Sequence, residues 1–205
     1  MKRATRAQTR SLIEHRHVLV AQLREEIGVP ATPAGRPALV MLMGFPGVGK
    51  SHCARLIAAR LGAAHIATDE LRSRLFVAAS YADEENRAVF GVAEALLDEL
   101  LSEGHRVVLD ATNLVARNRA ASEHAARARG APVIHVLVSA EESATRKRLL
   151  ERSLRRTAND HSDADVRVYE RMRERGFEPP AGGYLEIQNG PALSDEIERI
   201  ARALE

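Results

Sequence analysis

The residues best suited to do chemistry in this sequence lie at positions 44–51, which read GFPGVGKS. The spacing G-x-x-x-x-G-K-S is typical of a phosphate-binding loop, whose glycines let successive backbone N–H groups point at phosphate oxygens. We expect Lys50 to reach the β and γ phosphates of a nucleoside triphosphate and the Ser51 hydroxyl to bind Mg²⁺. The other predicted nucleotide contacts are Gly44, Pro46, Gly47, Val48, Gly49 and His52. A glycine-rich turn with an incidental lysine is the weaker interpretation, because this loop follows an apolar run and opens a helix.

Two carboxylates follow predicted strands and could meet the transferred phosphate. Asp69 lies in the segment TDELR at positions 68–72 and can accept the proton of an attacking hydroxyl. Asp110 ends the apolar run VVLD and is placed to orient Mg²⁺-bound water. Each acid also has a purely structural interpretation, Asp69 as a helix cap and Asp110 as the common end of a strand.

Arginines crowd the helix that follows the fourth predicted strand. They are Arg146, Arg148, Arg152, Arg155 and Arg156. Such a run is usually a solvated helix face. Here it leads into the polar segment TANDH, at the position of a lid in nucleotide kinases. A lid arginine that closes on the γ-phosphate compensates charge and is worth on the order of 10³–10⁵ in rate.

These residues need a scaffold, and strands and helices alternate from residue 38 onward. Short apolar runs predict strands at residues 38–43, 64–68, 106–110, 132–138 and 184–187. Helical spacing predicts helices at residues 50–61, 83–100, 116–129, from 139, 163–173 and 193–204. The pattern indicates an α/β fold with a doubly wound, mostly parallel five-stranded sheet. Together with the phosphate-binding loop, this order resembles the P-loop NTPase fold of the nucleoside-monophosphate-kinase kind, which implies a lid at about residues 152–165.

The N-terminal segment has a different character. Residues 9–27 predict an amphipathic helix, and a linker rich in proline and glycine ends it before residue 38. We therefore expect residues 1–37 to be an appendage that docks on the domain, on a second copy or on another partner. Residues 38–205 then form the catalytic domain.

Composition limits the class of protein. The 205 residues are 45% apolar, which suits one well-buried domain. The single cysteine, Cys53, excludes an internal disulfide framework and suits a reducing compartment. With no apolar run long enough to cross a bilayer and no secretory signal, the sequence predicts a cytoplasmic protein. The net charge of +2 gives no strong argument for a long nucleic-acid tract.

Several motifs together resemble the 5′-kinase domain of polynucleotide kinases and the small P-loop kinases related to it, over about residues 38–190. They are GFPGVGKS, TDELR, VVLDATNL with Arg117 and Arg119, LLERSLRR and DADVRVYERM. The resemblance implies that Lys50 and Ser51 serve ATP and Mg²⁺ and that Asp69 is the general base. It also implies that Arg72 clamps an acceptor phosphate, and that Arg152 and Arg156 are lid arginines, with Arg148 or Arg155 as alternatives for either role. Asn113 and Arg117 fall on its acceptor side. His52 departs from the Ser or Thr usual after the loop serine.

The sequence thus predicts an ATP-dependent phosphotransferase that uses Mg²⁺. The expected acceptor is the 5′-OH of a polynucleotide, and the alternative is a small-molecule kinase acting on a sugar, nucleoside or antibiotic. A nucleotide-gated binding protein that does not need Asp69 is a third possibility. A stacking aromatic would favour nucleic acid, and the candidates are Phe45, Phe76, Tyr81 and Phe90.

Overall fold

The sheet of the computed structural model is five-stranded and parallel throughout; the structure describes residues 16–76, 79–155 and 166–205. Its strands are β1 (Ala38–Met43), β2 (Ala64–Ala67), β3 (Arg106–Asp110), β4 (Val133–Ser139) and β5 (Leu185–Gln188). Their order is β2-β3-β1-β4-β5. Every residue of the central strand β1 is buried, which explains its unbroken apolar sequence. The predicted fold class is confirmed.

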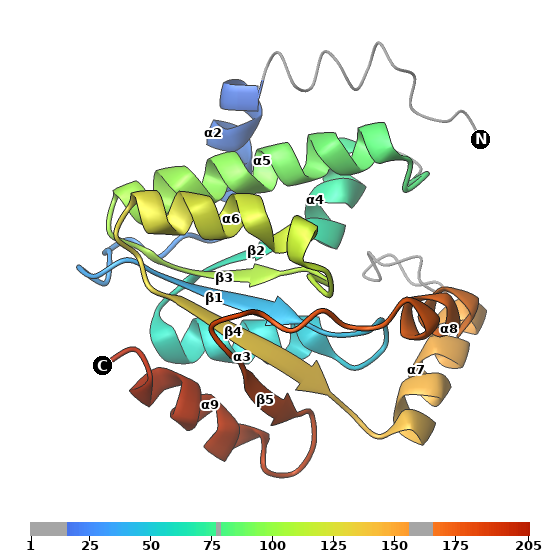
Figure 1. Cartoon of the computed structure of the whole chain (residues 1–205). Coiled ribbons are helices and arrows are strands. Elements are labelled where there is room, and N and C mark those ends of the chain that lie inside the picture. The colour runs from blue at the N-terminus through green and yellow to red at the C-terminus, as the bar shows by residue number, and fades with distance from the viewer. Residues whose placement is uncertain (1–15, 77–78, 156–165) are drawn as a thin grey trace.

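Helices cover both faces of the sheet (Figure 1). They are α2 (Arg16–Glu26), α3 (Lys50–Leu61), α4 (Thr68–Leu75), α5 (Asp83–Ser102), α6 (Ala116–Ala128), α7 (Glu142–Arg155), α8 (Val166–Arg175) and α9 (Leu193–Arg202). The helices α3 and α9 lie on one face, and α5 and α6 lie on the other (Figure 1). The helices α7 and α8 stand beyond the carboxyl ends of the strands, which is the edge where open α/β sheets bind ligands.

Two buried clusters hold this arrangement, and β1 contributes to both. Leu39 and Met41 pack toward α5, whereas Val40 and Leu42 pack toward α3 and α9. The alternation follows from the period of two in a strand, which sends successive side chains to opposite faces. Because both faces are closed by apolar side chains, the sheet gives a rigid base to the loops at its carboxyl edge.

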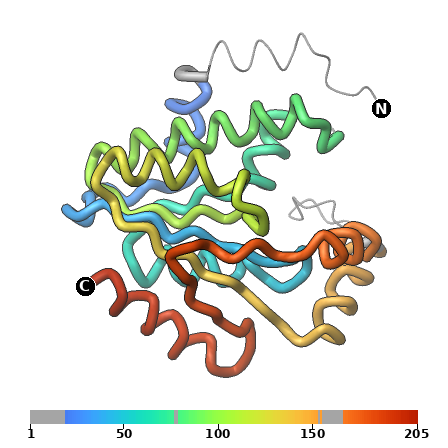
Figure 2. Tube along the Cα trace, in the orientation of Figure 1, coloured from blue at the N-terminus to red at the C-terminus, as the bar shows by residue number. Residues whose placement is uncertain are grey.

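The segment before β1 packs on the domain. The helix expected at residues 9–27 is observed as α2, and residues 9–15 lie outside the described part of the chain. It runs beside α5 (Figure 2), with Val20 and Leu23 buried in the same core as α5. Arg24 donates a hydrogen bond of 2.6 Å to Glu99 of α5.

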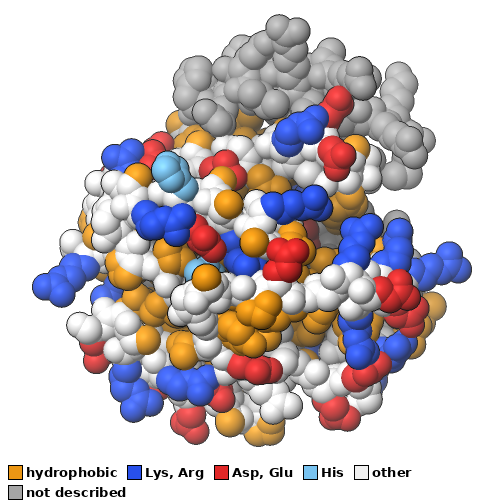
Figure 3. Space-filling model, in the orientation of Figure 1, with side chains coloured by type: hydrophobic (Ala, Val, Ile, Leu, Met, Phe, Trp, Pro, Cys, Tyr) orange, Lys and Arg blue, Asp and Glu red, His pale blue; other side chains and the backbone are white. Residues whose placement is uncertain are grey.

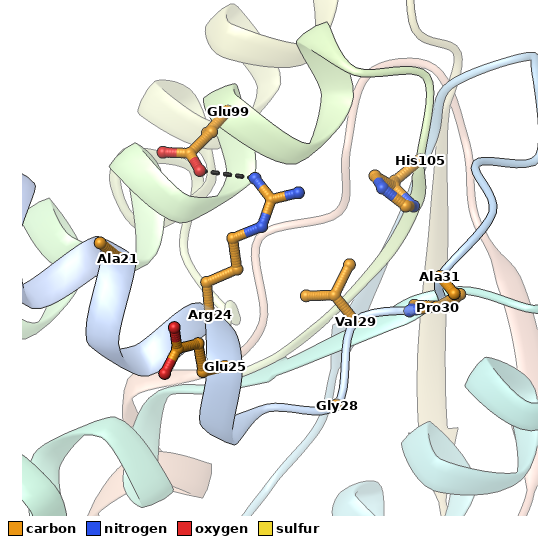
Figure 4. A pocket seen from close by; sticks show the side chains of 9 residues that line it. All are labelled: Ala21, Arg24, Glu25, Gly28, Val29, Pro30, Ala31, Glu99 and His105. Carbon is orange, nitrogen blue, oxygen red and sulfur yellow. Dashed lines mark hydrogen bonds and ion pairs between the residues drawn. The ribbon is translucent and has the colours of Figure 1, made fainter.

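An open pocket of about 510 Å³ lies where α2, α5 and the start of β3 meet (Figure 4). Its lining includes Arg24, Glu99 and His105, and His105 directly precedes β3. The pocket is therefore at the amino ends of the strands, and the phosphate-binding loop is at their carboxyl ends.

Two further findings concern helices. The helix α4, which the sequence reading did not assign as an element, starts directly after β2 at Thr68. Within the described ranges, no helix is both long and apolar enough to cross a bilayer.

Candidate functional site

The segment at residues 44–49 turns sharply from β1 into α3. Three of its glycines have positive φ, namely 152° at Gly44, 82° at Gly47 and 92° at Gly49. Among the described residues, no side chain caps the first turn of α3. The amides of a helix start with no side-chain cap attract anions, because the unsatisfied N–H groups and the helix dipole act together. The predicted loop thus has the local conformation of an oligophosphate cradle.

Side chains from distant parts of the chain press on the outside of this loop. A Cβ added to Gly49 would lie 2.0 Å from the side-chain nitrogen of Asn189, and one added to Gly47 would lie 2.7 Å from Leu149. Asn189 donates from Nδ2 to the carbonyl of Val48 at 2.9 Å. Sequence reasoning missed Asn189, which follows β5 and has no local signal of this role. The loop is thus held by α7 and by the end of β5.

Lys50 is the central charge of the site. Its Nζ donates to the carbonyl oxygen of Phe45 at 3.0 Å, which folds the side chain back over the loop. Burial lowers the pKa of Lys50, and the positive charge of Arg152 acts in the same direction. The carboxylates of Asp110 and Asp69 oppose this effect, so both acids lie close enough for their charge to reach Lys50. Of the residues predicted to be catalytic, Asp69 and Arg152 therefore both lie within electrostatic reach of Lys50.

Asp110 and Ser51 form an oxygen-rich pair beside Lys50. Burial alone would raise the pKa of Asp110, but polar contacts with His65 and Ser51 and the charge of Lys50 outweigh it and lower that pKa. His65 Nε2 lies 3.4 Å from Asp110 Oδ2. An ionised carboxylate next to a hydroxyl and an anion-binding loop fits Mg²⁺, which prefers hard oxygen ligands and phosphate. No local sequence signal marks this contact of His65 with Asp110.

Asp69 is positioned by the start of α4. The preceding residue, Thr68, is buried and its hydroxyl donates to the carbonyl oxygen of Asp110 at 3.3 Å. This bond ties α4 to the end of β3. It holds Asp69 at the carboxyl edge of the sheet, where Asp69 is half-buried and, like Asp110, acts electrostatically on Lys50.

Arg72 is not presented to an acceptor, which differs from the role expected of it. Only 4% of its surface is exposed, and its Nη1 donates to Glu85 at 2.6 Å. Its Nη2 donates to Asn86 at 2.9 Å. A guanidinium that is paired with a buried carboxylate offers less charge to a phosphate than an unpaired one, so this geometry disfavours the phosphate-clamp role, which stays a prediction.

Asn113 and Arg117, expected on the acceptor side, occupy different environments. Asn113 is buried and donates from Nδ2 to the carbonyl of Leu42 at 2.9 Å, which joins the ends of β3 and β1. Arg119, also buried, donates to the carbonyl of Asn113 at 2.9 Å. Asn113 and Arg119 therefore stabilise the segment that follows β3. Because Asn113 is buried, it is not exposed to an acceptor. Arg117 is exposed in the first turn of α6.

Part of the predicted lid lies outside the described residues, namely positions 156–165, which include Arg156. Of the described arginines, Arg152 is half-buried near Lys50, and Arg148 directs Nη1 at the carbonyls of Gly47 and Val48, each at 3.4 Å. In the view of Figure 3, basic side chains gather over the end of the molecule that α7 and α8 form.

A family model described as an AAA domain matches residues 39–180, which is more than half of the chain. No curated protein matches the sequence. The matched region contains the phosphate-binding loop, Asp69, Asp110 and the arginines of α7.

Several solved structures share the fold at low sequence identity. The APS kinase CysC of Mycobacterium tuberculosis, in complex with AMPPNP and APS, is 16% identical with a TM-score of 0.61 and covers 84% of this chain and 99% of its own. Kti12 of Chaetomium thermophilum, in complex with ADP-AlF3, is 20% identical with a TM-score of 0.62 and covers 82% and 100%. A gluconokinase of Sinorhizobium meliloti is 20% identical with a TM-score of 0.56 and covers 82% and 95%. At these identities the likeness shows the fold.

Proposed function

This chain belongs to the AAA domain family, and from that premise we propose that it is an ATP-dependent kinase that phosphorylates a hydroxyl group. The observation that carries the proposal is that the carboxylates of Asp69 and Asp110 both act electrostatically on Lys50, the residue that opens α3 after the phosphate-binding loop. Proteins of this fold include ones solved with AMPPNP and with ADP-AlF3, which supports ATP as the phosphate donor.

In the proposed reaction, the loop amides and Lys50 bind the β and γ phosphates. The acceptor hydroxyl attacks the γ-phosphorus, a new O–P bond forms, and the bond to the β-phosphate oxygen breaks as ADP leaves. Asp69 orients the hydroxyl and takes its proton late, because the transition state is loose. Arg152, and Arg156 from the predicted lid, compensate the charge that develops on the phosphoryl oxygens.

Ser51 and Asp110 are the residues that would hold Mg²⁺. When bound, the ion neutralises negative charge on the nucleotide phosphates. The role of His65 is to hold the Asp110 carboxylate in place through the contact of 3.4 Å.

Two acceptor classes remain in the proposal. The sequence resemblance favours the 5′-OH of a polynucleotide. A small hydroxyl compound is the second candidate, and the burial of Arg72 against Glu85 favours it, because the arginine expected to hold an acceptor phosphate is neutralised. Gluconokinase, a kinase of a small molecule, has the same fold.

The proposal is tested by incubating the protein with γ-labelled ATP, Mg²⁺ and a pool of 5′-OH DNA, 5′-OH RNA, nucleosides and sugars. We expect the label to move to one class of hydroxyl compound. ATP binding with no labelled product from any member of the pool would favour the nucleotide-gated binding protein and count against the kinase.

A further inference from the structure

Tyr81 has a backbone conformation that its residue type disfavours. Its φ is 54°, in the left-handed region that bulky L-residues rarely occupy. Such conformations persist only where the surroundings impose them, and they cluster at functional sites. Tyr81 lies just before α5, at the junction that leads from α4.

The surroundings that impose this conformation are a buried carboxylate and a guanidinium. Glu85 accepts hydrogen bonds from the backbone N–H of Ser80 at 2.8 Å, from the Ser80 hydroxyl at 2.6 Å and from the N–H of Tyr81 at 3.3 Å. The guanidinium of Arg72 lies 4.5 Å from the centre of the Tyr81 ring, in a cation–π contact. The ion pair between Arg72 and Glu85 therefore fixes both the backbone and the ring of Tyr81.

This fixed ring is accessible and packs on α4, the helix that carries the proposed base. Tyr81 keeps 40% of its surface exposed. Arg72 follows Asp69 by three residues on α4, so both project from the same side of that helix. Through its contact with Arg72, the ring therefore packs on α4 about one turn after the proposed base.

The other candidate aromatics do not offer such a surface. Phe76 is buried with 6% exposed, and Phe45 packs edge-on against Tyr169 with ring centres 6.1 Å apart. Phe90 is half-buried within α5.

We propose that Tyr81 is the platform on which a nucleobase of the acceptor stacks, so that the acceptor is a nucleoside unit, either free or at the end of a polynucleotide. The proposal rests on the proposed function and deepens it. A neutralised Arg72 beneath the ring suits an uncharged planar group better than a phosphate. Stacking of one base on an aromatic side chain is worth about 1–3 kcal/mol, which corresponds to roughly a 5- to 150-fold change in the acceptor KM.

The kinetic test compares variants that keep or remove the ring. Tyr81→Asn removes the ring and its contact with Arg72 but relieves the strain of the positive φ, so the protein should still fold. We expect its acceptor KM to rise roughly 5- to 150-fold with the ATP KM unchanged, and Tyr81→Phe to restore the acceptor KM. Tyr184, which is also 40% exposed but precedes β5 at the opposite edge of the sheet, supplies the control Tyr184→Asn. An acceptor KM that is the same in wild type and Tyr81→Asn would overturn the proposal.

A binding test does not depend on turnover. The chain has no tryptophan, so Tyr81→Trp introduces a single indole emitter at the proposed platform. We expect saturable quenching by adenosine or by a short 5′-OH oligonucleotide, and none by an acyclic polyol. Saturation by one of the first two probes alone identifies the source of the base. If neither adenosine nor the oligonucleotide quenches the indole fluorescence, position 81 is not a stacking platform, even if the protein transfers phosphate. If quenching occurs without transfer, the kinase assignment fails and the platform stands.

Discussion

Gly49 provides the sharpest test of how the phosphate-binding loop is held. Its φ of 92° costs an L-residue about 1–2 kcal/mol. A methyl group there would also lie 2.0 Å from Asn189 Nδ2, so the amide must move and lose its hydrogen bond to Val48. That loss costs about 0.5–1.5 kcal/mol. We therefore expect Gly49→Ala to lower the free energy of unfolding by about 1.5–3.5 kcal/mol.

Gly62 is the matched control. It also has positive φ, at 57°, but an added Cβ would meet nothing within 4 Å. Gly62→Ala should therefore cost only about 1–2 kcal/mol. Urea unfolding measures both values, and titration with Mg·ATP should show weaker binding in Gly49→Ala alone.

The double variant Gly49→Ala, Asn189→Ala isolates the contact between the two residues. In the Asn189→Ala background, Gly49→Ala should cost about 0.5–1.5 kcal/mol less, because the hydrogen bond is already gone. Equal destabilisation by Gly49→Ala and Gly62→Ala, with no coupling to Asn189, would refute the reasoning.

Three further predictions concern buried charges. Lys50→Met should remove the thermal shift produced by Mg·ATP, because the ammonium group that reaches the phosphates is gone; an unchanged shift in scanning fluorimetry would contradict this. The pKa of Asp110 is lower in the folded protein than its unfolded-state value of about 3.9. Ionised Asp110 therefore stabilises the fold above that unfolded-state pKa, and this stability is lost as the pH falls through the folded-state pKa. Asp110→Asn should therefore flatten the dependence of Tm on pH below about pH 4, and an unchanged acid slope would count against the assignment. Glu85→Gln should cost about 3–5 kcal/mol in urea unfolding because it leaves Arg72 buried without its counter-charge, and the double variant Arg72→Met, Glu85→Leu should recover most of the loss; a single-variant cost below about 1 kcal/mol would show that the pair is not needed.

The sequence predicted local elements well because their signals are local. The apolar run at β1 and the lysine that opens α3 gave the bounds 38–43 and 50–61, which the structure reproduces. Asp110 likewise falls at the end of β3, as expected. The glycines between β1 and α3 have the positive φ values that a tight phosphate loop needs.

The sequence pattern did not predict contacts between residues that lie far apart in the chain. The sequence gives no sign that Arg72 is paired, because its partner Glu85 lies 13 positions away on another helix. Asn189 contacts the loop across 141 positions, and nothing in its neighbourhood marks it. Such pairs depend on strand order and helix packing, and a single sequence does not specify these.

The central claim is that Asp69 directs a hydroxyl at the γ-phosphate of ATP bound by the loop. The most direct measurement compares phosphate transfer and ATP binding in wild type, Asp69→Asn and the control Glu70→Gln, whose carboxylate pairs with Arg74 on the same helix. The account predicts that Asp69→Asn binds ATP normally but transfers phosphate roughly 10²–10⁴-fold more slowly, while Glu70→Gln behaves as wild type. Transfer by Asp69→Asn at the wild-type rate would contradict it.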